Sequence, residues 1–516
     1  MFVLAGLLIG AAGAEAKPHK AKAKDCLPGQ PQGAPGIGDE YYPTYGNGGY
    51  DVQRYLLDVA YDPATDVLDG KATIRARATQ SVCSFNLDFV GLEISKITVD
   101  GDKATWTRDA DEPGDAHELT VTPKEPLERG KCFEVFVRYS GVPVEFVLPG
   151  FGIRTGFMAV PDGVTVAGQP EVAAAWYPVN DHPLDKAAYR FEVTVPRGYE
   201  VAANGRLRDV DEGGGRSTWE WVAREPMASY LATIDIGFWD VTRSKTDDGL
   251  PVYDAVDSAL TGDLRAAIDS SLARQGEVLD VLEGAFGPYP FSTVGAIVDN
   301  QDDLFFALET QTRPVYSKLF WLDSQGNVVN GDGVIVHELA HQWFGDDVAL
   351  ARWQDIWLNE GFATYAEWLW AEHEGQGTPA EIFRATYADI PADDPFWATV
   401  IGDPGIDLLF DNAVYVRGAM TLQVLREEVG DDAFFEIVKQ WASSKSGGNG
   451  TTPQFIALAE QVSGMQLDEL FDTWLFTGER PVLEDPAPTG ARAQSARSYS
   501  AGWLDQVQAR LARGRY

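Results

Sequence analysis

The first part of the chain alternates hydrophobic and polar residues with a period of two. The stretch KATIRARAT, residues 71–79, carries alanine or isoleucine at every second position and lysine, threonine or arginine between them. The stretches FEVFVRYSG (133–141) and YRFEVTVP (189–196) repeat this period, and clusters of Gly, Pro and Asp separate the runs. Because successive strand residues point to opposite faces, the pattern predicts half-buried strands. We therefore expect a β-sheet domain over residues 39–243.

The pattern changes near Ser244. Residues 259–287 have helical spacing, and the short apolar run TVGAIVD (293–299) predicts a buried strand. Beyond Gly333 helical spacing dominates as far as about Pro481. The expected fold class is therefore multidomain α and β, with an N-terminal all-β domain followed by a mostly helical domain over residues 244–481.

Both ends of the chain differ from these two domains. An apolar run over residues 2–14 ends in Ala-Glu-Ala, which fits a small-x-small cleavage site, although no Lys or Arg precedes the run. We expect residues 1–16 to be a signal peptide, too short to be a stable membrane span, and the protein to be secreted. Residues 17–38, rich in Pro, Gly and Lys, are predicted to be a linker. Residues 482–516 are predicted to be a tail, with a short amphipathic helix that carries Trp503, Leu504, Val507 and Leu511 on one side.

The net charge limits the classes of partner, and the cysteine content indicates the compartment. The 516-residue chain has a formal net charge of -37, which makes nucleic acid and anionic membrane surfaces poor partners. Three cysteines suit an exported protein with one disulfide, and Cys83 with Cys132 is the preferred pair because both lie in strand-like stretches of one domain. The alternative is that Cys26 and these two are simply small hydrophobic residues. We expect a monomer.

One stretch carries metal chemistry. In VIVHELAHQWFG, His337 and His341 are four residues apart, so on a helix both imidazoles lie on one face and can reach a single ion. A catalytic zinc ion takes three protein ligands and leaves one position open. Glu360, with eighteen residues between it and His341, is the expected third ligand, for one zinc ion per chain. Glu338 is placed to act as general base towards a water molecule that the metal acidifies.

The longer stretch HELAHQWFGDDVALARWQDIWLNEGFATYAEW (337–368) resembles the gluzincin zinc aminopeptidases, the family that contains aminopeptidase N and leukotriene hydrolase. The resemblance covers residues 38–481. It implies a saddle-like β-domain and a thermolysin-like catalytic domain, with peptides that have a free N-terminus as substrates. Only residues 482–516 follow, so we expect the large C-terminal helical domain of many members to be missing and the cleft to be more open.

The resemblance also suggests how the substrate amine is held. FALETQTRP (306–314) falls where the family has its Gly-x-Met-Glu-Asn loop, so Glu309 would bind the free N-terminal ammonium. Phe306 replaces the usual glycine, Leu308 the methionine and Thr310 the asparagine. Gln169, in the stretch GQPEVAAAWYPVNDHPLDKAAY (168–189), corresponds to a second amine-binding residue. Glu171, two residues later, is an alternative to Gln169, because the register of the match with the family is open. His182 in the same stretch is interpreted as a structural residue.

Two further groups of residues are expected near the metal. NAVYVRGAM (412–420) resembles the family's Tyr-x-Lys-Gly element, so Tyr415 would donate its phenol to the oxyanion, while Arg417 stands in place of lysine. A metal-bound histidine usually passes its second ring proton to an oxygen. Asp355, Asn359 and Glu367 are the candidates for that partner.

The sequence leaves three function classes open. A zinc aminopeptidase is preferred. A zinc endopeptidase or other hydrolase on the same scaffold becomes the better interpretation if the altered loop over residues 306–310 does not hold an amine. A non-catalytic binding protein is the third class, and the complete set of ligands, base and tyrosine argues against it.

Overall fold

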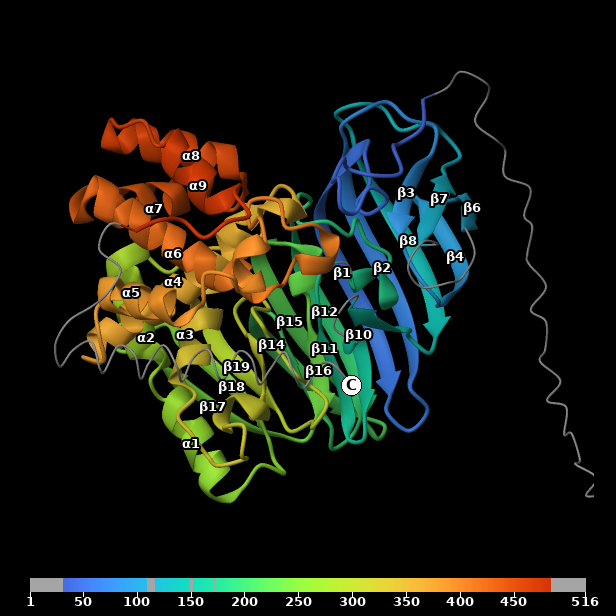
Figure 1. Ribbon diagram of the computed structural model, residues 1–516. Helices are drawn as coiled ribbons and strands as arrows, with labels where there is room; N and C mark the ends of the chain where they lie inside the picture. The colour runs from blue at the N-terminus through green and yellow to red at the C-terminus, as the bar shows by residue number, and fades with distance from the viewer. Residues whose placement is uncertain (1–30, 109–116, 149–151, 171, 484–516) are drawn as a thin grey trace, which may run out of the picture.

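The computed structural model describes residues 31–108, 117–148, 152–170 and 172–483. The predicted signal peptide, most of the predicted linker and the predicted tail helix lie outside the described residues. Figure 1 shows two parts side by side, a β-rich part built from the first half of the chain and a helical part built from the second half. This arrangement confirms the predicted fold class.

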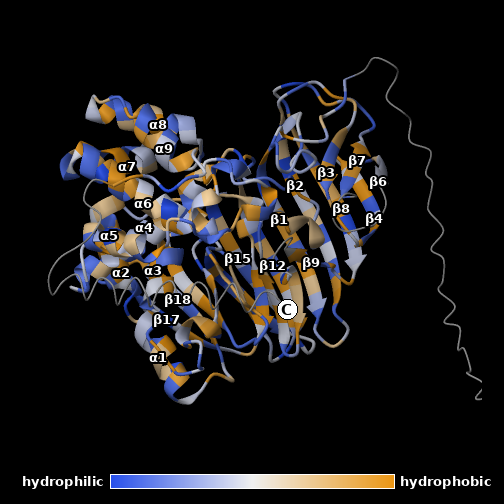
Figure 2. Ribbon diagram, in the orientation of Figure 1, coloured by the Kyte–Doolittle hydropathy of each residue, from blue (hydrophilic) through white to orange (hydrophobic). Residues whose placement is uncertain are grey.

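A large twisted sheet forms the centre of the β-rich part. Its middle strands β1 (Tyr50–Asp62) and β12 (Ala187–Pro196) run parallel, and the remaining strand pairs are antiparallel. The stretch KATIRARAT lies in β2 (Val67–Ala78), where the alanine and isoleucine side chains face the core and the arginines face solvent, as predicted. Figure 2 shows this alternation of hydrophobic and hydrophilic positions along the strands. The strand order is β14 (Arg206–Gly213), β15 (Arg216–Met227), β12, β1, β2, β8 (Cys132–Gly141), β4 (Glu93–Val99) and β5 (Asp102–Lys103).

Two smaller sheets complete this part. The first has the order β3 (Phe85–Asp88), β7 (Glu118–Thr122) and β6 (Thr105–Arg108). The second has the order β13 (Glu200–Ala203), β16 (Ile234–Gly237), β11 (Gly163–Ala167), β10 (Ile153–Val160) and β9 (Glu145–Leu148).

Among the described residues, the second half contains a five-stranded mixed sheet, a two-stranded parallel sheet of β22 (Ala349–Leu350) and β23 (Asn449–Gly450), and nine α-helices. The five-stranded sheet has the order β17 (Trp239–Lys245), β18 (Pro251–Asp257), β19 (Val294–Asp299), β21 (Val315–Ser317) and β20 (Ala307–Leu308), and β19 is the strand predicted from TVGAIVD. Within the described ranges, none of the helices is both long and apolar enough to cross a membrane. The nine helices are α1 (Gly262–Leu272), α2 (Gln275–Phe286), α3 (Asp332–His341), α4 (Trp357–His373), α5 (Pro379–Asp389), α6 (Asn412–Val429), α7 (Asp431–Lys445), α8 (Thr452–Ser463) and α9 (Asp468–Leu475).

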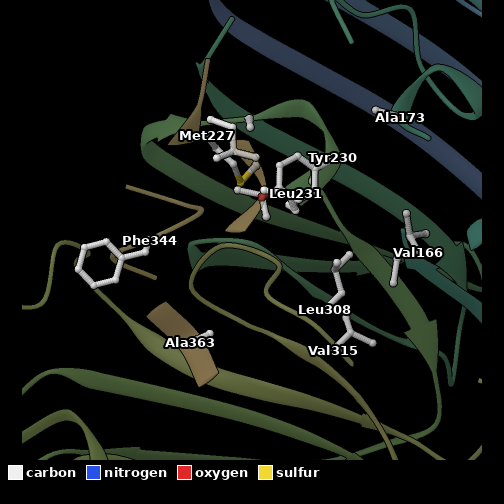
Figure 3. Close-up of a cluster of buried hydrophobic side chains, with 14 of the residues drawn as sticks. Val166, Ala173, Met227, Tyr230, Leu231, Leu308, Val315, Phe344 and Ala363 are labelled. Atoms are coloured by element: carbon white, nitrogen blue, oxygen red, sulfur yellow. The ribbon is translucent and has the colours of Figure 1, made fainter. Parts of the chain in front are cut away.

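The two parts share one hydrophobic core. β17 spans the predicted domain boundary at residue 243. Its backbone pairs with β18, so the whole strand belongs to the sheet of the second half. Figure 3 shows a buried cluster to which both parts contribute side chains. A continuous apolar contact of this kind holds two domains in a fixed relation. The labelled members are Val166, Ala173, Met227, Tyr230 and Leu231 from the first part and Leu308, Val315, Phe344 and Ala363 from the second.

The predicted disulfide between Cys83 and Cys132 is wrong. Cys132 is a free, exposed thiol at the first position of β8, whereas Cys83 is buried and disulfide-bonded. The third cysteine, Cys26, lies outside the described residues. Two cysteines can pair only if their Cβ atoms face each other at close range, and strand-like sequence context carries no information on that geometry.

Candidate active site

Three side chains from two helices converge on one point. α3 carries His337 and His341, whose ring centroids are 4.8 Å apart. α4 packs against α3 and presents Glu360 from its first turn. The Nε2 atoms of His337 and His341 lie 3.4 and 3.3 Å from the same oxygen, Glu360 Oε2. The apolar residues before the motif, Val334, Ile335 and Val336, pack into the core, and on the same helix His341 is buried and His337 is partly buried.

The second nitrogen of each imidazole is also fixed. His337 Nδ1 lies 2.8 Å from Glu367 Oε1, and His341 Nδ1 lies 3.0 Å from the carbonyl oxygen of Phe344. Both partners accept hydrogen bonds, so the Nδ1 atoms donate and the Nε2 lone pairs face Glu360. Of the three partners proposed from the sequence, the structure places Glu367 at an imidazole. Asp355 instead accepts from the Arg352 guanidinium and the Thr452 backbone N–H, and no hydrogen bond joins Asn359 to either ring among the described residues.

This donor set fits a divalent metal ion. Two imidazole nitrogens and one carboxylate oxygen lie within 4.8 Å of one another, with hydrogen-bonded outer partners. Burial tends to raise the pKa of Glu360, but the adjacent imidazoles of His341 and His337 lower it below its usual range, so the carboxylate is charged. A buried anion facing two nitrogen lone pairs is the arrangement that zinc neutralises.

Glu338 lies beside this centre and has the environment of a proton acceptor. Its side chain is buried on α3, and burial raises its pKa to about 7 while the neighbouring imidazoles of His337 and His341 act to lower it. A carboxyl group with a pKa near neutrality can both take and return a proton at physiological pH.

A second buried carboxylate, that of Glu309, lies close to Glu338 and His341. Glu309 follows β20, is 2% exposed, and accepts a hydrogen bond at Oε1 from the Tyr230 hydroxyl at 3.0 Å. Glu309, Glu338 and His341 each offer a donor atom within 4.8 Å of the others. Burial raises the pKa of Glu309, with His341 acting to lower it and Glu360 to raise it. The structure therefore brings Glu309 to the metal centre.

The loop that carries Glu309 is ordered despite its unusual sequence. The Thr310 hydroxyl donates to the Arg313 carbonyl at 2.6 Å and closes a tight turn. Gln342, the residue after the second histidine, accepts from the Thr312 backbone N–H at 2.7 Å and donates to the Glu309 carbonyl at 3.1 Å. Sequence reasoning missed Gln342, although its place directly after the metal motif was a signal that it faces the loop.

Tyr415 is held near His337 by a close helix crossing. α6 crosses α4 where Gly418 meets Gly361, and a Cβ atom on Gly418 would lie only 2.7 Å from Gly361 Cα. This contact puts the Tyr415 ring nearly parallel to the His337 ring, with centroids 6.0 Å apart.

Arg417, on the same helix as Tyr415, serves the fold rather than the site. It is fully buried, and burial lowers its pKa to about 10. Its guanidinium donates to four backbone carbonyls, those of Trp397, Thr399, Thr473 and Thr477.

The stretch around Gln169 gives a mixed result. Gln169 is half-buried, and its Oε1 atom has no hydrogen-bond partner among the described residues. No hydrogen bond between described residues joins Gln169 to Glu309, and its rival Glu171 lies outside the described residues. His182 is buried and structural: its Nδ1 accepts the Leu184 backbone N–H at 3.1 Å, and its Nε2 lies 3.2 Å from Asp39 Oδ2.

Comparison with known proteins agrees with this geometry. Residues 50–231 match the peptidase M1 N-terminal domain and residues 275–474 match the peptidase family M1 domain. Probable aminopeptidase 1 of Sulfurisphaera tokodaii is 26% identical over 449 residues, 84% of this chain and 54% of its own length. Human glutamyl aminopeptidase is 25% identical over 339 residues, 61% of this chain and 34% of its own length. The chain thus spans about half or less of the length of these relatives.

Solved structures match over a larger share of both chains. The crystal structure of an M1 zinc metallopeptidase from Deinococcus radiodurans matches with a TM-score of 0.76 and 28% identity, over 88% of this chain and all of that one. A mutant of that enzyme bound to a Tyr-Ser-Ala substrate matches equally well, with 28% identity and the same coverage. With both domains matched in order and a complete set of metal-binding side chains, this chain belongs to peptidase family M1.

Proposed function

We propose that this protein is a zinc aminopeptidase, which removes single residues from the N-terminus of peptides. The observation that carries the proposal is the position of Glu309, a buried carboxylate within 4.8 Å of donor atoms of Glu338 and His341. A fixed negative charge at this distance from the metal centre binds the substrate's α-ammonium and places the first peptide bond at the reacting centre.

The other side chains then have defined tasks. His337, His341 and Glu360 would hold the zinc ion, which when bound polarises the scissile carbonyl and lowers the pKa of a water molecule. Glu338 takes the proton of the attacking water and delivers it to the leaving amine. Tyr415 donates its phenol to the oxygen that becomes negatively charged as the carbonyl is attacked. Gln169, with its unpartnered buried amide oxygen, is proposed to accept a second hydrogen bond from the ammonium.

A panel of fluorogenic aminoacyl substrates tests the proposal. We expect hydrolysis of at least one member, loss of activity with a chelator, and recovery when zinc is added. An N-acetylated copy of the best substrate should not be cleaved, because acetylation removes the charge that Glu309 binds. Cleavage of the acetylated copy at the same rate would show an endopeptidase instead.

The general base has its own test. Glu338→Gln preserves the shape of the side chain but removes its proton affinity, so turnover should fall by about three orders of magnitude or more. Its zinc content should stay at one ion per chain. A variant that keeps near wild-type turnover would exclude Glu338 as the base.

Export is also a proposal. It is supported by the apolar run over residues 2–14, which precedes a small-x-small site, and by the disulfide bond at Cys83, since such bonds persist in oxidising compartments. N-terminal sequencing of protein recovered from the culture medium would test it, and a mature chain that still begins at Met1 would contradict it.

A further inference from the structure

A buried tyrosine of the β-rich part reaches across to the active site. Tyr230 lies in a short 3-10 helix (Ser229–Leu231) and is 2% exposed. Its hydroxyl donates to Glu309 Oε1 at 3.0 Å. Figure 3 shows its ring beside the buried side chains of Leu231 and Met227. A hydroxyl of the β-rich part, that of Tyr230, therefore forms a hydrogen bond with a carboxylate of the helical part, that of Glu309.

Glu309 needs such a partner because its surroundings favour other orientations. Its carboxylate lies within 4.8 Å of donor atoms on both Glu338 and His341. A glutamate side chain has several rotatable bonds, so a carboxylate without a fixed partner can turn towards the nearby imidazole or away from the negative charge of Glu338. A hydrogen bond to Oε1 restricts this rotation and leaves Oε2 as the acceptor for an ammonium group.

The position of the tyrosine is itself well determined. Its ring packs edge-on against Trp353 of the helical part, with centroids 5.4 Å apart. Asn204 ties the two segments together: its Nδ2 donates to the Leu231 carbonyl and to the Gln311 carbonyl, each at 2.9 Å. The backbone next to Tyr230 is therefore linked through one amide to the loop that carries Glu309. Both partners of the hydrogen bond are held before a substrate arrives, which avoids an entropic cost on binding.

We propose that Tyr230 is a positioning residue for amine recognition, which orients the Glu309 carboxylate so that one of its oxygens is presented to the α-ammonium of the substrate. This inference rests on the proposed aminopeptidase function and extends it to a residue that makes no contact with the reacting atoms. It predicts that the Tyr230 hydroxyl contributes to the binding of ligands that have an amine and contributes nothing to ligands that lack one.

A matched pair of inhibitors tests this directly on the zinc-loaded full chain. L-leucine hydroxamate and isocaproic hydroxamate share the zinc-binding group and the side chain, and only the first has an α-amine. In Tyr230→Phe, we expect the inhibition constant of L-leucine hydroxamate to rise about tenfold, the typical effect of losing a hydrogen bond to a charged group. The constant for isocaproic hydroxamate should stay within about twofold. For aminoacyl substrates KM should rise much more than kcat falls.

Two further variants make the outcomes distinct. Tyr365→Phe removes another buried tyrosine hydroxyl, which donates to Gln423 Oε1 at 3.0 Å, and it should weaken both inhibitors equally or not at all. Glu309→Gln should weaken only L-leucine hydroxamate, and combining it with Tyr230→Phe should add little further loss.

Each result decides a different question. If Glu309→Gln discriminates between the inhibitors and Tyr230→Phe does not, the positioning role is overturned and the proposed function stands. If Tyr230→Phe weakens both inhibitors equally, Tyr230 is structural only, and the inference is again overturned. If Glu309→Gln fails to discriminate, the amine-binding role of Glu309 is wrong, and the proposed function falls together with the role of Tyr230.

Discussion

The crossing of α4 and α6 offers a sharp test of how the fold positions the catalytic groups. In Gly418→Ala the new Cβ would lie 2.7 Å from Gly361 Cα, and the contacted atom is backbone, which cannot rotate away. The helices must separate by about 0.7 Å to reach 3.4 Å, where ordinary van der Waals contact begins. Tyr415, three residues earlier on α6, moves with the helix. A misplacement of about 1 Å can cost on the order of 100-fold in rate, so we expect kcat to fall roughly 10- to 100-fold.

The energetic effect on folding should be smaller than the effect on rate. Overpacking costs about 1–3 kcal/mol, and replacing a helical glycine by alanine returns up to about 1 kcal/mol. Steady-state kinetics gives kcat, thermal unfolding gives the stability, and metal analysis shows whether Glu360, next to Gly361, still holds zinc.

Gly284→Ala is the matched control for this experiment. Gly284 lies in α2, and a Cβ there meets nothing within 4 Å. This variant should keep wild-type kcat and be equally stable or slightly more stable. Wild-type kcat and stability in Gly418→Ala would refute the argument that the glycine contact sets the position of Tyr415.

Three further predictions follow from contacts of the site and the core. Glu367→Gln weakens the charge-assisted hydrogen bond to His337 Nδ1, so zinc affinity measured by chelator competition should fall about 10-fold; unchanged affinity would mean that the contact does not tune the ligand. Arg417→Lys leaves several buried carbonyls without a donor and should lower the free energy of unfolding by about 1–3 kcal/mol, whereas an unaltered denaturant midpoint would argue against that role. Burial raises the pKa of Asp299 to about 6 from 3.8, so the folded chain binds this proton more tightly than the unfolded chain, and the contribution of the residue to stability falls as pH rises from about 4 to about 6. Asp299→Asn should therefore stabilise the protein more at pH 8 than at pH 4, as measured by denaturant unfolding, and an equal effect at both pH values would contradict the reasoning.

The sequence predicted best what depends on local spacing. The alternation in KATIRARAT became the two faces of β2, and the helical spacing around His337 and His341 became one face of α3. The family could be predicted from the stretch that contains this motif. His337, His341 and Glu360 lie within 24 residues of one another, on α3 and in the first turn of α4, so one short stretch of sequence encodes the whole metal site. The choice among Asp355, Asn359 and Glu367 stayed open because it depends on which helix turn faces the imidazole.

Contacts between distant segments were beyond the reach of local patterns. The Tyr230 hydroxyl is 79 residues from Glu309 in the chain, and nothing in either stretch indicates that they meet. The disulfide prediction failed for the same reason, since the direction of the Cys132 side chain depends on where β8 begins. Arg417 was expected only to stand in place of a lysine, and its hydrogen bonds to four backbone carbonyls depend on residues 397–399 and 473–477, which pack against α6.

The segment around Asp39 changes how a minimal recombinant form of this protein should be chosen. Asp39 contacts His182 of the β-rich part and accepts from the Trp353 backbone N–H of the helical part at 2.8 Å, yet it lies in a stretch without helix or strand. A chain trimmed to Tyr50, where β1 and the family match begin, would leave these two buried polar groups without their acceptor. Trp353 also packs against Tyr230, so the same trimming would loosen the support of the tyrosine that touches Glu309. The smallest functional unit therefore extends upstream of the first strand.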